Sequence, residues 1–494
     1  MVSRFLACCS ICLLSVGSFV WASSESSQQR VSIAVSDNVG ATSMIGARES
    51  GLLFTIHGSN TIGAKLAPTW AKAYLEAKGL ANVALLPGEK DNEYFVEGEN
   101  AGEPVYIAIY AHGSSTGFKG LKENSADIAM SSRPIKAVEN RSIDSRNDLT
   151  RFESEHVVAI DGLAVIVHPS NPLNALNKSE VARIFSGEFI NWRELGGPDL
   201  PIRLYARDNK SGTWDTFKNI VLAKKYKLSA FSRRFESNDR LSEHVSQDVQ
   251  AIGFVGLASV LSSKALAISD DETQAIFPEP IYVATEDYPL ARRLFMYSVP
   301  DKGNYYSREF LQFVQTEVGQ KIVEDVGFVS QKPVALAVNP LDGPSEYNRV
   351  VKNGERLSVN FRFNIGSATL DNKAKHDVSR LVSFMSLPEN RDKLVQLIGF
   401  GDAKSTEQRA VLLSKLRALS VKSALHRLGV YAEPVTGFGA DLPVASLSGG
   451  LKHKNQRVEV WVFDPQHKAS LSEAKSLVNK KYKEELTSRL VLFN

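Results

Sequence analysis

Between residues 51 and 332, short apolar segments alternate with amphipathic stretches, and this pattern constrains the fold more than any other feature of the 494-residue chain. The apolar segments include Leu52 to Ile56, Val105 to Ile109, Leu163 to Val167 and Ile202 to Tyr205. Most of them are followed by a turn containing Gly or Ser and then by a helical pattern. Strands that alternate with helices in this way predict an α/β domain with a largely parallel sheet.

A second, smaller α/β unit is expected from 357 to 465, because a chain of this length divides into two or three domains. Its expected elements are a strand from Leu357 to Phe363, a helix over 371–386, a strand from Lys393 to Phe400, a helix over 405–428 and a strand from Arg457 to Phe463. The segment 333–356 lacks sustained periodicity, so we interpret it as a linker. The Lys- and Glu-rich tail over 466–494 predicts a solvated helix.

The chain begins with the pattern of a secretory signal peptide. Arg4 precedes an apolar run from Phe5 to Val20, and Val20 and Ala22 occupy the small-residue positions of a cleavage site, so 1–22 is expected to be removed. Two alternatives are an uncleaved membrane anchor, for which the run is short, and a lipoprotein at Leu6-Ala7-Cys8. A Ser-rich leader is expected over 23–50, with one possible strand from Val31 to Val35.

The cysteines and the charge limit the class of protein. Cys8, Cys9 and Cys12 all lie in the signal segment, so the mature chain is expected to need no disulfides and to lack thiolate chemistry. The formal charge of +3 falls to about +2 without Arg4, and the sequence contains no long basic stretch, which argues against nucleic-acid binding. No later segment is apolar enough over about 20 residues to span a membrane. We therefore expect an exported periplasmic protein.

Three turns in the first domain carry groups that suit an oxyanion. They are Gly58 to Gly63, Gly113 to Gly117 and Arg207 to Thr213, and each follows an expected strand. A helix that begins after such a turn offers free N–H groups, hydroxyls add donors, and the guanidinium of Arg207 adds charge. For any single turn, ordinary helix capping by Ser or Thr explains the residues equally well. Three such turns in one domain favour a site.

With these turns, the stretch 51–332 resembles the periplasmic phosphate-binding proteins of ABC transporters, which have a two-lobed type 2 periplasmic-binding fold. The resemblance rests on Gly58-Ser59-Asn60-Thr61, Gly113-Ser114-Ser115, Asp127 to Arg133, Asn171-Pro172, Ile184 to Trp192, Arg207 with Ser211-Gly212-Thr213, Ile252 to Val255 and Tyr288 to Arg292.

The resemblance implies phosphate, or a similar oxyanion, held between two lobes. The side-chain contacts would be Thr61, Ser114, Arg207, Ser211 and Thr213, with backbone N–H groups from Ile62, Ser115 and Gly212. Lobe one would comprise about 51–160 and 260–332, and lobe two about 161–259. Val157 to Val167 and Ile252 to Val255 would contain the crossings.

Ser132 marks a departure from the best-known members of that family. They carry an Asp there, which accepts the proton of hydrogen phosphate and repels fully ionised sulfate. A Ser can donate or accept, so we include Ser132 in the site and expect weaker discrimination against sulfate. Asn209 also replaces an acidic residue that braces the Arg in some members.

The second unit contains an acid and a base placed to hold a zwitterion. Asp402 ends the strand that finishes at Gly401, and Arg417 lies in the following helix. Asp402 would take an ammonium and Arg417 a carboxylate. On chemistry alone, a structural ion pair or two unrelated surface charges explain them at least as well.

Residues 357–463 as a whole resemble the OmpA-like peptidoglycan-binding domain. The resemblance rests on Val359 to Phe363, Ala368 to Leu370, Gly399 to Asp402, Leu413 to Val421, Gly437 to Gly439 and Asn455 to Glu459. It implies that Asp402 and Arg417 grip the diaminopimelate of the peptidoglycan stem peptide. Ala410 and Gly401 stand where the family usually has Asn and Thr, which predicts an altered affinity.

These features predict a binding protein and no enzyme, cofactor or metal site. The nine histidines show no metal-ligand spacing, and no nucleophile elbow is present. We expect an envelope solute-binding protein that is anchored non-covalently to peptidoglycan. We also expect it to be associated with the outer membrane, and an envelope protein is a possible partner. The alternative is a structural or adhesive wall protein whose first domain has lost anion binding. Phosphate-ester hydrolysis, with His57 or His112 as base, is a distant third.

Overall fold

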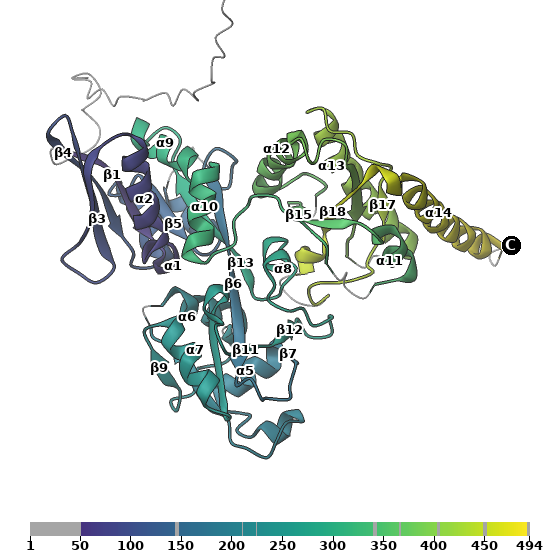
Figure 1. Ribbon diagram of the computed structural model, residues 1–494, viewed down its shortest axis with the longest axis horizontal. Coiled ribbons are helices and arrows are strands. Elements are labelled where there is room, and N and C mark those ends of the chain that lie inside the picture. The colour runs from purple at the N-terminus through teal and green to yellow at the C-terminus, as the bar shows by residue number, and fades with distance from the viewer. Residues whose placement is uncertain are drawn as a thin grey trace, which may run out of the picture.

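The computed structural model describes residues 51–491 except for 144–147, 210, 224, 339–342, 365–366, 403–405 and 448–451. The expected signal peptide and leader lie outside the described residues. Two lobes and a C-terminal unit are visible in Figure 1. The main sheet has the order β2-β3-β4-β1-β5-β13-β6-β10-β8-β9 and continues through both lobes. The α/β fold agrees with the alternation and the two lobes with the resemblance, but the sheet is mixed and not largely parallel, because five of its neighbouring pairs run antiparallel.

Lobe one forms around β1, whose central residues are buried on both faces, as expected for a parallel strand between helices. Phe54 of β1 packs on Phe310, and Trp70 and Tyr74 fill the space between the strand and the helices. The strands are β1 (Leu52–Gly58), β2 (Ala81–Pro87), β3 (Glu93–Asn100), β4 (Glu103–Tyr110) and β5 (Ile128–Ser131), and the helices are α1 (Asn60–Gly63), α2 (Leu66–Ala77), α3 (Ser114–Glu123), α4 (Ala137–Ile143), α9 (Tyr305–Phe313) and α10 (Glu317–Val326).

Lobe two is held together by an aromatic core. Phe217 and Phe254 stack with ring centroids 3.9 Å apart, and Phe185 packs edge-on against both. Its strands are β7 (Ala175–Asn177), β8 (Arg203–Arg207), β9 (Arg233–Phe235), β10 (Ala251–Gly256), β11 (Lys264–Ala265) and β12 (Ala267–Ser269), and its helices are α5 (Lys178–Ser186), α6 (Gly212–Phe217), α7 (Asn238–Gln247) and α8 (Pro280–Ala284).

One strand and one return connection join the lobes. β6 (Glu155–Val167) pairs with β13 (Ala291–Ser298) through Gly162 and with β10 from Leu163 onward, so it crosses between the lobes as expected. The second expected crossing, Ile252 to Val255, is wrong. Those residues lie in β10, inside lobe two between β6 and β8, and β11 and β12 extend the same lobe, so the chain returns to lobe one only at β13.

The C-terminal unit has a sheet of order β14-β15-β18-β16-β17. Its elements are β14 (Ala335–Leu336), α11 (Ser345–Val351), β15 (Glu355–Arg362), α12 (Asn372–Ser386), β16 (Leu394–Gly399), α13 (Glu407–His426), β17 (Thr436–Gly437), β18 (Arg457–Phe463) and α14 (Lys468–Val491). One face of α13 packs on the sheet through Ala418, Val421 and Leu425. This is the apolar stripe that the sequence shows.

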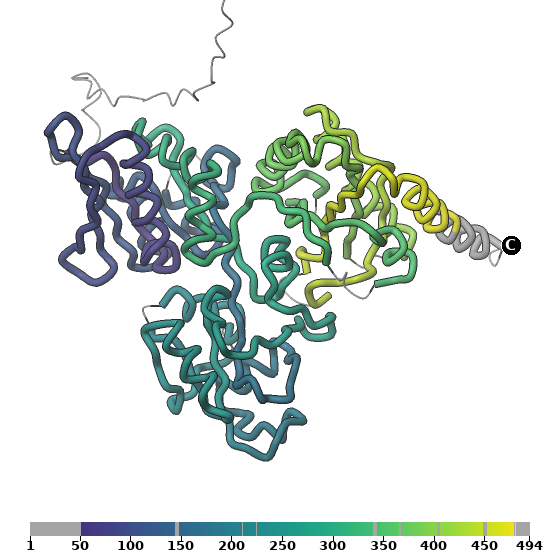
Figure 2. The backbone as a smooth tube through the Cα atoms, viewed as in Figure 1, coloured from purple at the N-terminus to yellow at the C-terminus, as the bar shows by residue number. Residues whose placement is uncertain are grey.

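The segment expected to be a linker contains ordered elements of this unit. β14 pairs with β15, and α11 buries Tyr347 completely, with its hydroxyl donating to Glu459 at 2.8 Å. The C-terminal tail forms the expected helix, α14, which runs from the unit toward the C-terminus (Figure 2). It is not solvated all round, because Leu471, Ala474 and Val478 are buried.

The C-terminal unit docks on the lobes through a buried ionic cluster. Asp287, which follows α8, receives hydrogen bonds from Arg356 at 2.5 Å and from Asn360 and Arg362 of β15 at 2.9 and 3.2 Å. Three donors share one carboxylate. Burial raises the pKa of Asp287, but the positive charges of Arg356, Arg457 and Arg362 outweigh it and hold this pKa below its usual value. Removing one partner from such a cluster leaves unpaired buried charge, so the cluster fixes how the unit sits.

Candidate functional site

Three of the predicted serines lie together at the edge of lobe one. Ser114 and Ser115 begin α3, and Ser132 follows β5. The Ser132 N–H donates to the Ser114 hydroxyl at 3.1 Å, and the two hydroxyl oxygens lie 3.4 Å apart. Arg133 donates to the Ser115 hydroxyl at 3.1 Å. The Thr116 N–H of the first turn of α3 donates to the Gly113 carbonyl at 2.9 Å, while the first N–H groups of a helix lack acceptors within it, so this corner is rich in donors.

Arg207 supplies the charge on the side of lobe two. It ends β8 and is 8 % exposed. Its guanidinium is held by two backbone carbonyls, with Nε donating to Phe235 at 3.2 Å and Nη2 to Glu236 at 2.5 Å, while the Asp208 carboxylate lies 4.0 Å away. Burial lowers the pKa of Arg207, with Asp208 as the largest opposing influence. Neutral carbonyls orient the group without neutralising its charge.

Ser211, Gly212 and Thr213 form the turn that starts α6. The Ser211 hydroxyl accepts from the N–H of Trp214 at 3.3 Å, so it caps the helix as the simpler interpretation expects. Thr213 lies 3.5 Å from Nη1 of Arg207. Asn209 accepts from Arg234 at 2.8 Å, so the residue that replaces the acid of some family members contacts a different Arg.

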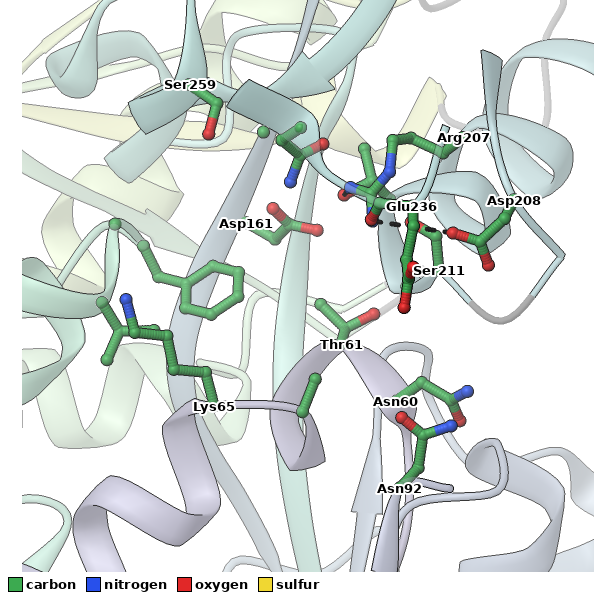
Figure 3. Close-up of a pocket in the computed structure, with 18 of the residues that line it drawn as sticks. Asn60, Thr61, Lys65, Asn92, Asp161, Arg207, Asp208, Ser211, Glu236 and Ser259 are labelled. Atoms are coloured by element: carbon green, nitrogen blue, oxygen red, sulfur yellow. Dashed lines mark hydrogen bonds and ion pairs between the residues drawn. The ribbon is translucent and has the colours of Figure 1, made fainter. Parts of the chain in front are cut away.

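The two lobes meet where Gly212 approaches Thr61 of α1. A Cβ at Gly212 would lie 2.1 Å from the Thr61 hydroxyl oxygen and 2.4 Å from its Cα. Only a residue without a side chain permits this approach. Figure 3 shows Thr61 and Ser211 reaching toward each other from opposite walls of the cleft.

Arg292 lies at this contact between the lobes, although the sequence indicated no role for it beyond ending the Tyr288 to Arg292 motif. From β13 it donates to the Thr61 hydroxyl at 2.8 Å and to the Gly212 carbonyl at 3.0 Å, and its Nη1 lies 3.4 Å from the Ser132 carbonyl. Its Nε donates to Asp161 of β6 at 3.0 Å. Arg292 thus contacts Thr61 of lobe one and Gly212 of lobe two, and it also reaches Ser132, which lies with Ser114 and Ser115.

A cleft of about 830 Å³ lies between the lobes. Of the predicted residues, its walls contain Thr61, Arg207, Ser211, Gly212 and Thr213. Ser132 lines a separate cavity, Ser114 and Ser115 adjoin it through the contacts above, and the Ile62 side chain is buried in lobe one. The structure therefore brings the predicted residues together as two groups, which Arg292 connects.

Acidic side chains also line this cleft. Asp161, Asp91, Asp208 and Glu236 are present beside the basic Lys65 and Arg207, and Arg292 pairs with Asp161. The cleft therefore does not attract anions through a general excess of positive charge. An oxyanion would have to be selected by directed donors at short range.

In the C-terminal unit, Asp402 and Arg417 are linked through a third residue, Gln456. Arg417 donates to the Gln456 side-chain oxygen at 2.7 Å, and the Gln456 amide donates to Asp402. Arg417 is buried, and a Cβ at Gly401 would lie 2.8 Å from its Nη1, so the missing side chain at Gly401 makes room for the guanidinium. Gln456 had no motif role in the sequence argument, and only its place between Asn455 and Arg457 marked it.

The part of the chain that the structure describes contains no cluster of three or more His, Cys, Asp or Glu able to hold a metal ion. Within the same residues, no helix combines the length and the apolar character needed to cross a bilayer. His112 contacts Glu93 at 2.9 Å, and burial is the main reason that the pKa of His57 is lowered.

Two family models match the chain. A "PBP superfamily domain" matches residues 79–318, and the "OmpA family" matches residues 362–457. The chain is 34 % identical over 239 residues to "Protein SphX" of Synechococcus elongatus, covering 46 % of this chain and 69 % of that protein. It is 30 % identical over 224 residues to "Phosphate-binding protein PstS" of Bacillus subtilis, covering 45 % and 70 %.

Among solved structures, an ABC-type phosphate transport receptor from Vibrio cholerae aligns with a TM-score of 0.44 and 24 % identity. The alignment covers 56 % of this chain and 99 % of that one.

Proposed function

The chain belongs to the family of the phosphate-binding proteins PstS and SphX and carries an OmpA family domain after it, and on this premise we propose that it captures phosphate between its lobes while bound to peptidoglycan. The observation that carries the first half is Arg207, a buried cation oriented by two carbonyls at the wall of the cleft. A buried guanidinium without a directly bonded carboxylate favours an anion as its partner.

Phosphate would be held by donors from both lobes. Arg207, Ser211 and Thr213 would bind from lobe two, and Thr61 with Ser114, Ser115 and Ser132 from lobe one. The N–H groups of Ile62 and Gly212 would add backbone donors. Arg292 would contribute its charge and hold Thr61 in place, since it already donates to that hydroxyl.

Ser132 would make this site less selective than one with a carboxylate. Its hydroxyl lies against that of Ser114 and can either donate to or accept from an oxyanion. We therefore propose that sulfate competes with phosphate. Calorimetry with each anion tests this selectivity, and a strong preference for phosphate would contradict it.

The C-terminal unit would bind the stem peptide of peptidoglycan at Asp402 and Arg417. The amide of Gln456 presents to this pair one nitrogen donor and one oxygen acceptor on the same carbon. The free end of diaminopimelate presents an ammonium and a carboxylate on neighbouring atoms. We propose that this end displaces the amide, because charged partners make stronger hydrogen bonds than neutral ones.

Sedimentation with purified sacculi tests the wall-binding half. The full mature chain should pellet with sacculi, and Arg417→Ala should stay in the supernatant. Arg409→Ala is the matched control, because Arg409 lies exposed on the same helix. Equal pelleting of parent and Arg417→Ala would overturn this half.

A thermal-shift screen against phosphate, sulfate and related anions tests the other half, since ligands that bind only the native state raise the melting point. We propose an exported protein that holds or senses phosphate at the wall, because anchoring hinders shuttling to a transporter. The structural or adhesive alternative predicts pelleting with sacculi and no response to any small anion.

A further inference from the structure

A second large cavity lies at the junction of the two lobes and the C-terminal unit. It has a volume of about 1010 Å³. Lobe one contributes Ser132 and Arg133 to its wall, lobe two contributes Ile220, and the C-terminal unit contributes Arg362 and Lys454. The motifs that point to phosphate and peptidoglycan supply Ser132, Arg292 and Arg362 to this wall, but Lys454 lies outside all of them.

Basic side chains outnumber acidic ones in the wall of this junction cavity. The bases are Arg133, Arg151, Arg292, Arg293, Arg362, Lys375 and Lys454, and the acids are Glu153, Glu155, Glu286 and Asp371. Arg293 satisfies two of the acids, with bonds of 2.9 Å to Glu286 and 2.8 Å to Asp371. Carboxylates outside the wall pair with three further bases, Glu139 with Arg133, Asp161 with Arg292 and Asp287 with Arg362. Arg151, Lys375 and Lys454 then face Glu153 and Glu155, and this small excess of positive charge in a partly desolvated space favours an anionic occupant.

Lys454 is the buried cation of this wall with the most donor capacity left. It is 7 % exposed, and its ammonium donates to the Ala291 carbonyl at 3.3 Å. An ammonium has three donors, and one long bond to a carbonyl is poor compensation for burial. Burial accordingly lowers the pKa of Lys454 to about 8. At neutral pH most molecules still carry the charge.

Arg362 provides a second unfilled donor on the same wall. It is 4 % exposed, and its Nε has no hydrogen-bond partner among the described atoms, with the nearest Glu286 oxygen 4.0 Å away. Its other nitrogens donate to the carbonyls of Thr285 and Lys454 and to the Asp287 carboxylate, which fixes the guanidinium against the Lys454 backbone.

We propose that the junction cavity is a second anion site, which takes a small molecule bearing two or more phosphate or carboxylate groups through Lys454 and Arg362. The volume suits a ligand larger than a single phosphate ion. Arg292 also lines this cavity while donating to Thr61 in the cleft, so the two sites share a wall. The cavity shares Ser132 and Arg292 with the phosphate site proposed above, whereas Lys454 and Arg362 line the junction cavity and not the cleft.

Calorimetry on the full mature chain tests the proposal, with pyrophosphate as the phosphate probe and citrate as the carboxylate probe. Arg207→Gln serves as background, because it weakens the cleft and leaves the junction cavity intact. At least one probe should bind this variant with one site per chain, and adding Lys454→Gln should weaken that binding about tenfold or more. Whichever probe binds identifies the acidic group that the site prefers.

Lys452→Gln is the matched control, because Lys452 is exposed two residues away in the same turn and does not line the cavity. Lys454→Arg should keep most of the affinity, which separates loss of charge from loss of folding. Absence of binding of both probes at millimolar concentration to Arg207→Gln would overturn the proposal. Equal binding by the Lys454→Gln and Lys452→Gln versions would overturn it as well.

Discussion

At the scale of single residues, the account depends most on the charge of Arg207. Arg207→Gln keeps a shorter polar side chain and removes the positive charge. We expect phosphate affinity to fall by about 10- to 100-fold, which corresponds to the roughly 1.5–3 kcal/mol of a hydrogen bond to a charged group. Titration calorimetry measures the change. Arg203→Gln, on the same strand with an exposed side chain, should bind like the parent.

Gln456 gives the second prediction at this scale, and here we expect a substitution to increase the affinity for the ligand. If its amide occupies the place of the ligand, Gln456→Ala should bind a diaminopimelate-containing stem peptide about two- to tenfold more tightly, because the hydrogen bonds to the amide no longer have to be broken. Fluorescence anisotropy with a labelled peptide measures the affinity. Weaker or unchanged binding would show that Gln456 supports the ligand or plays no part, and Arg417→Ala should bind poorly in either case.

The sequence predicts which residues lie at the site better than it predicts which residues contact one another. The resemblance to the phosphate-binding proteins implied that Thr61, Arg207, Ser211, Gly212 and Thr213 share one site, and all five line the cleft. The roles of Arg292 and Gln456 could not be deduced, because each depends on partners that fold next to it from distant segments. The sequence around an Arg in a strand, or around a Gln between two motif residues, does not indicate that its side chain will link residues from distant segments.

At the scale of elements, the contact between α1 and α6 is a close approach of the two lobes. Gly212→Ala would place a methyl group against the Thr61 backbone and hydroxyl, at distances that no real side chain tolerates. We expect phosphate affinity to fall about tenfold or more, because overpacking of this kind costs roughly 1–3 kcal/mol. Small-angle scattering with and without phosphate should also show a smaller change in dimensions than in the parent.

Gly256→Ala is the control for this element. Gly256 also lines the cleft, but a Cβ there would have its nearest neighbour 3.9 Å away, and its backbone suits any residue. It should bind phosphate normally. Equal affinity of Gly212→Ala and the parent would mean that the two helices do not meet in the bound state.

Elements with strong periodicity were predictable, and short ones were not. The strand from Arg457 to Phe463 and the helices over 371–386 and 405–428 appear close to their expected bounds. The sequence did not predict α11, because its buried face spans barely two turns and lies among Pro and Gly residues. This face consists of Tyr347, Val350 and Val351. The mistaken crossing in β10 has a different origin, since strand pairing across a sheet is not encoded in the residues of one strand.

At the scale of the whole molecule, docking of the C-terminal unit should weaken in acid. His156 of β6 and His376 of α12 lie near this interface, where the His376 ring stacks on Phe152 with centroids 4.3 Å apart. Burial lowers the pKa of each histidine to about 4, with His376 also acting on His156 and Arg380 on His376. The interface of the folded protein therefore holds both rings neutral at pH values where an unfolded chain would protonate them.

The sign follows from proton binding. Between the ordinary histidine pKa of 6.5 and about 4, the unfolded chain binds protons that the native state does not, so stability is full above 6.5 and falls as the pH drops through this window. We expect the melting temperature to decline from pH 6.5 to 4, and His376→Gln to make the decline shallower. His426→Gln, an exposed histidine of the same unit, should leave the slope unchanged. Parallel slopes for all three proteins would contradict this assignment.

The central claim, that one chain holds phosphate while bound to the wall, can be tested in a single sedimentation measurement. Purified sacculi are mixed with the mature protein and radiolabelled phosphate and then pelleted. We predict that label pellets in proportion to the protein, that Arg207→Gln pellets without label, and that Arg417→Ala leaves protein and label together in the supernatant. Pelleted parent protein with all of the label left in solution would contradict the account.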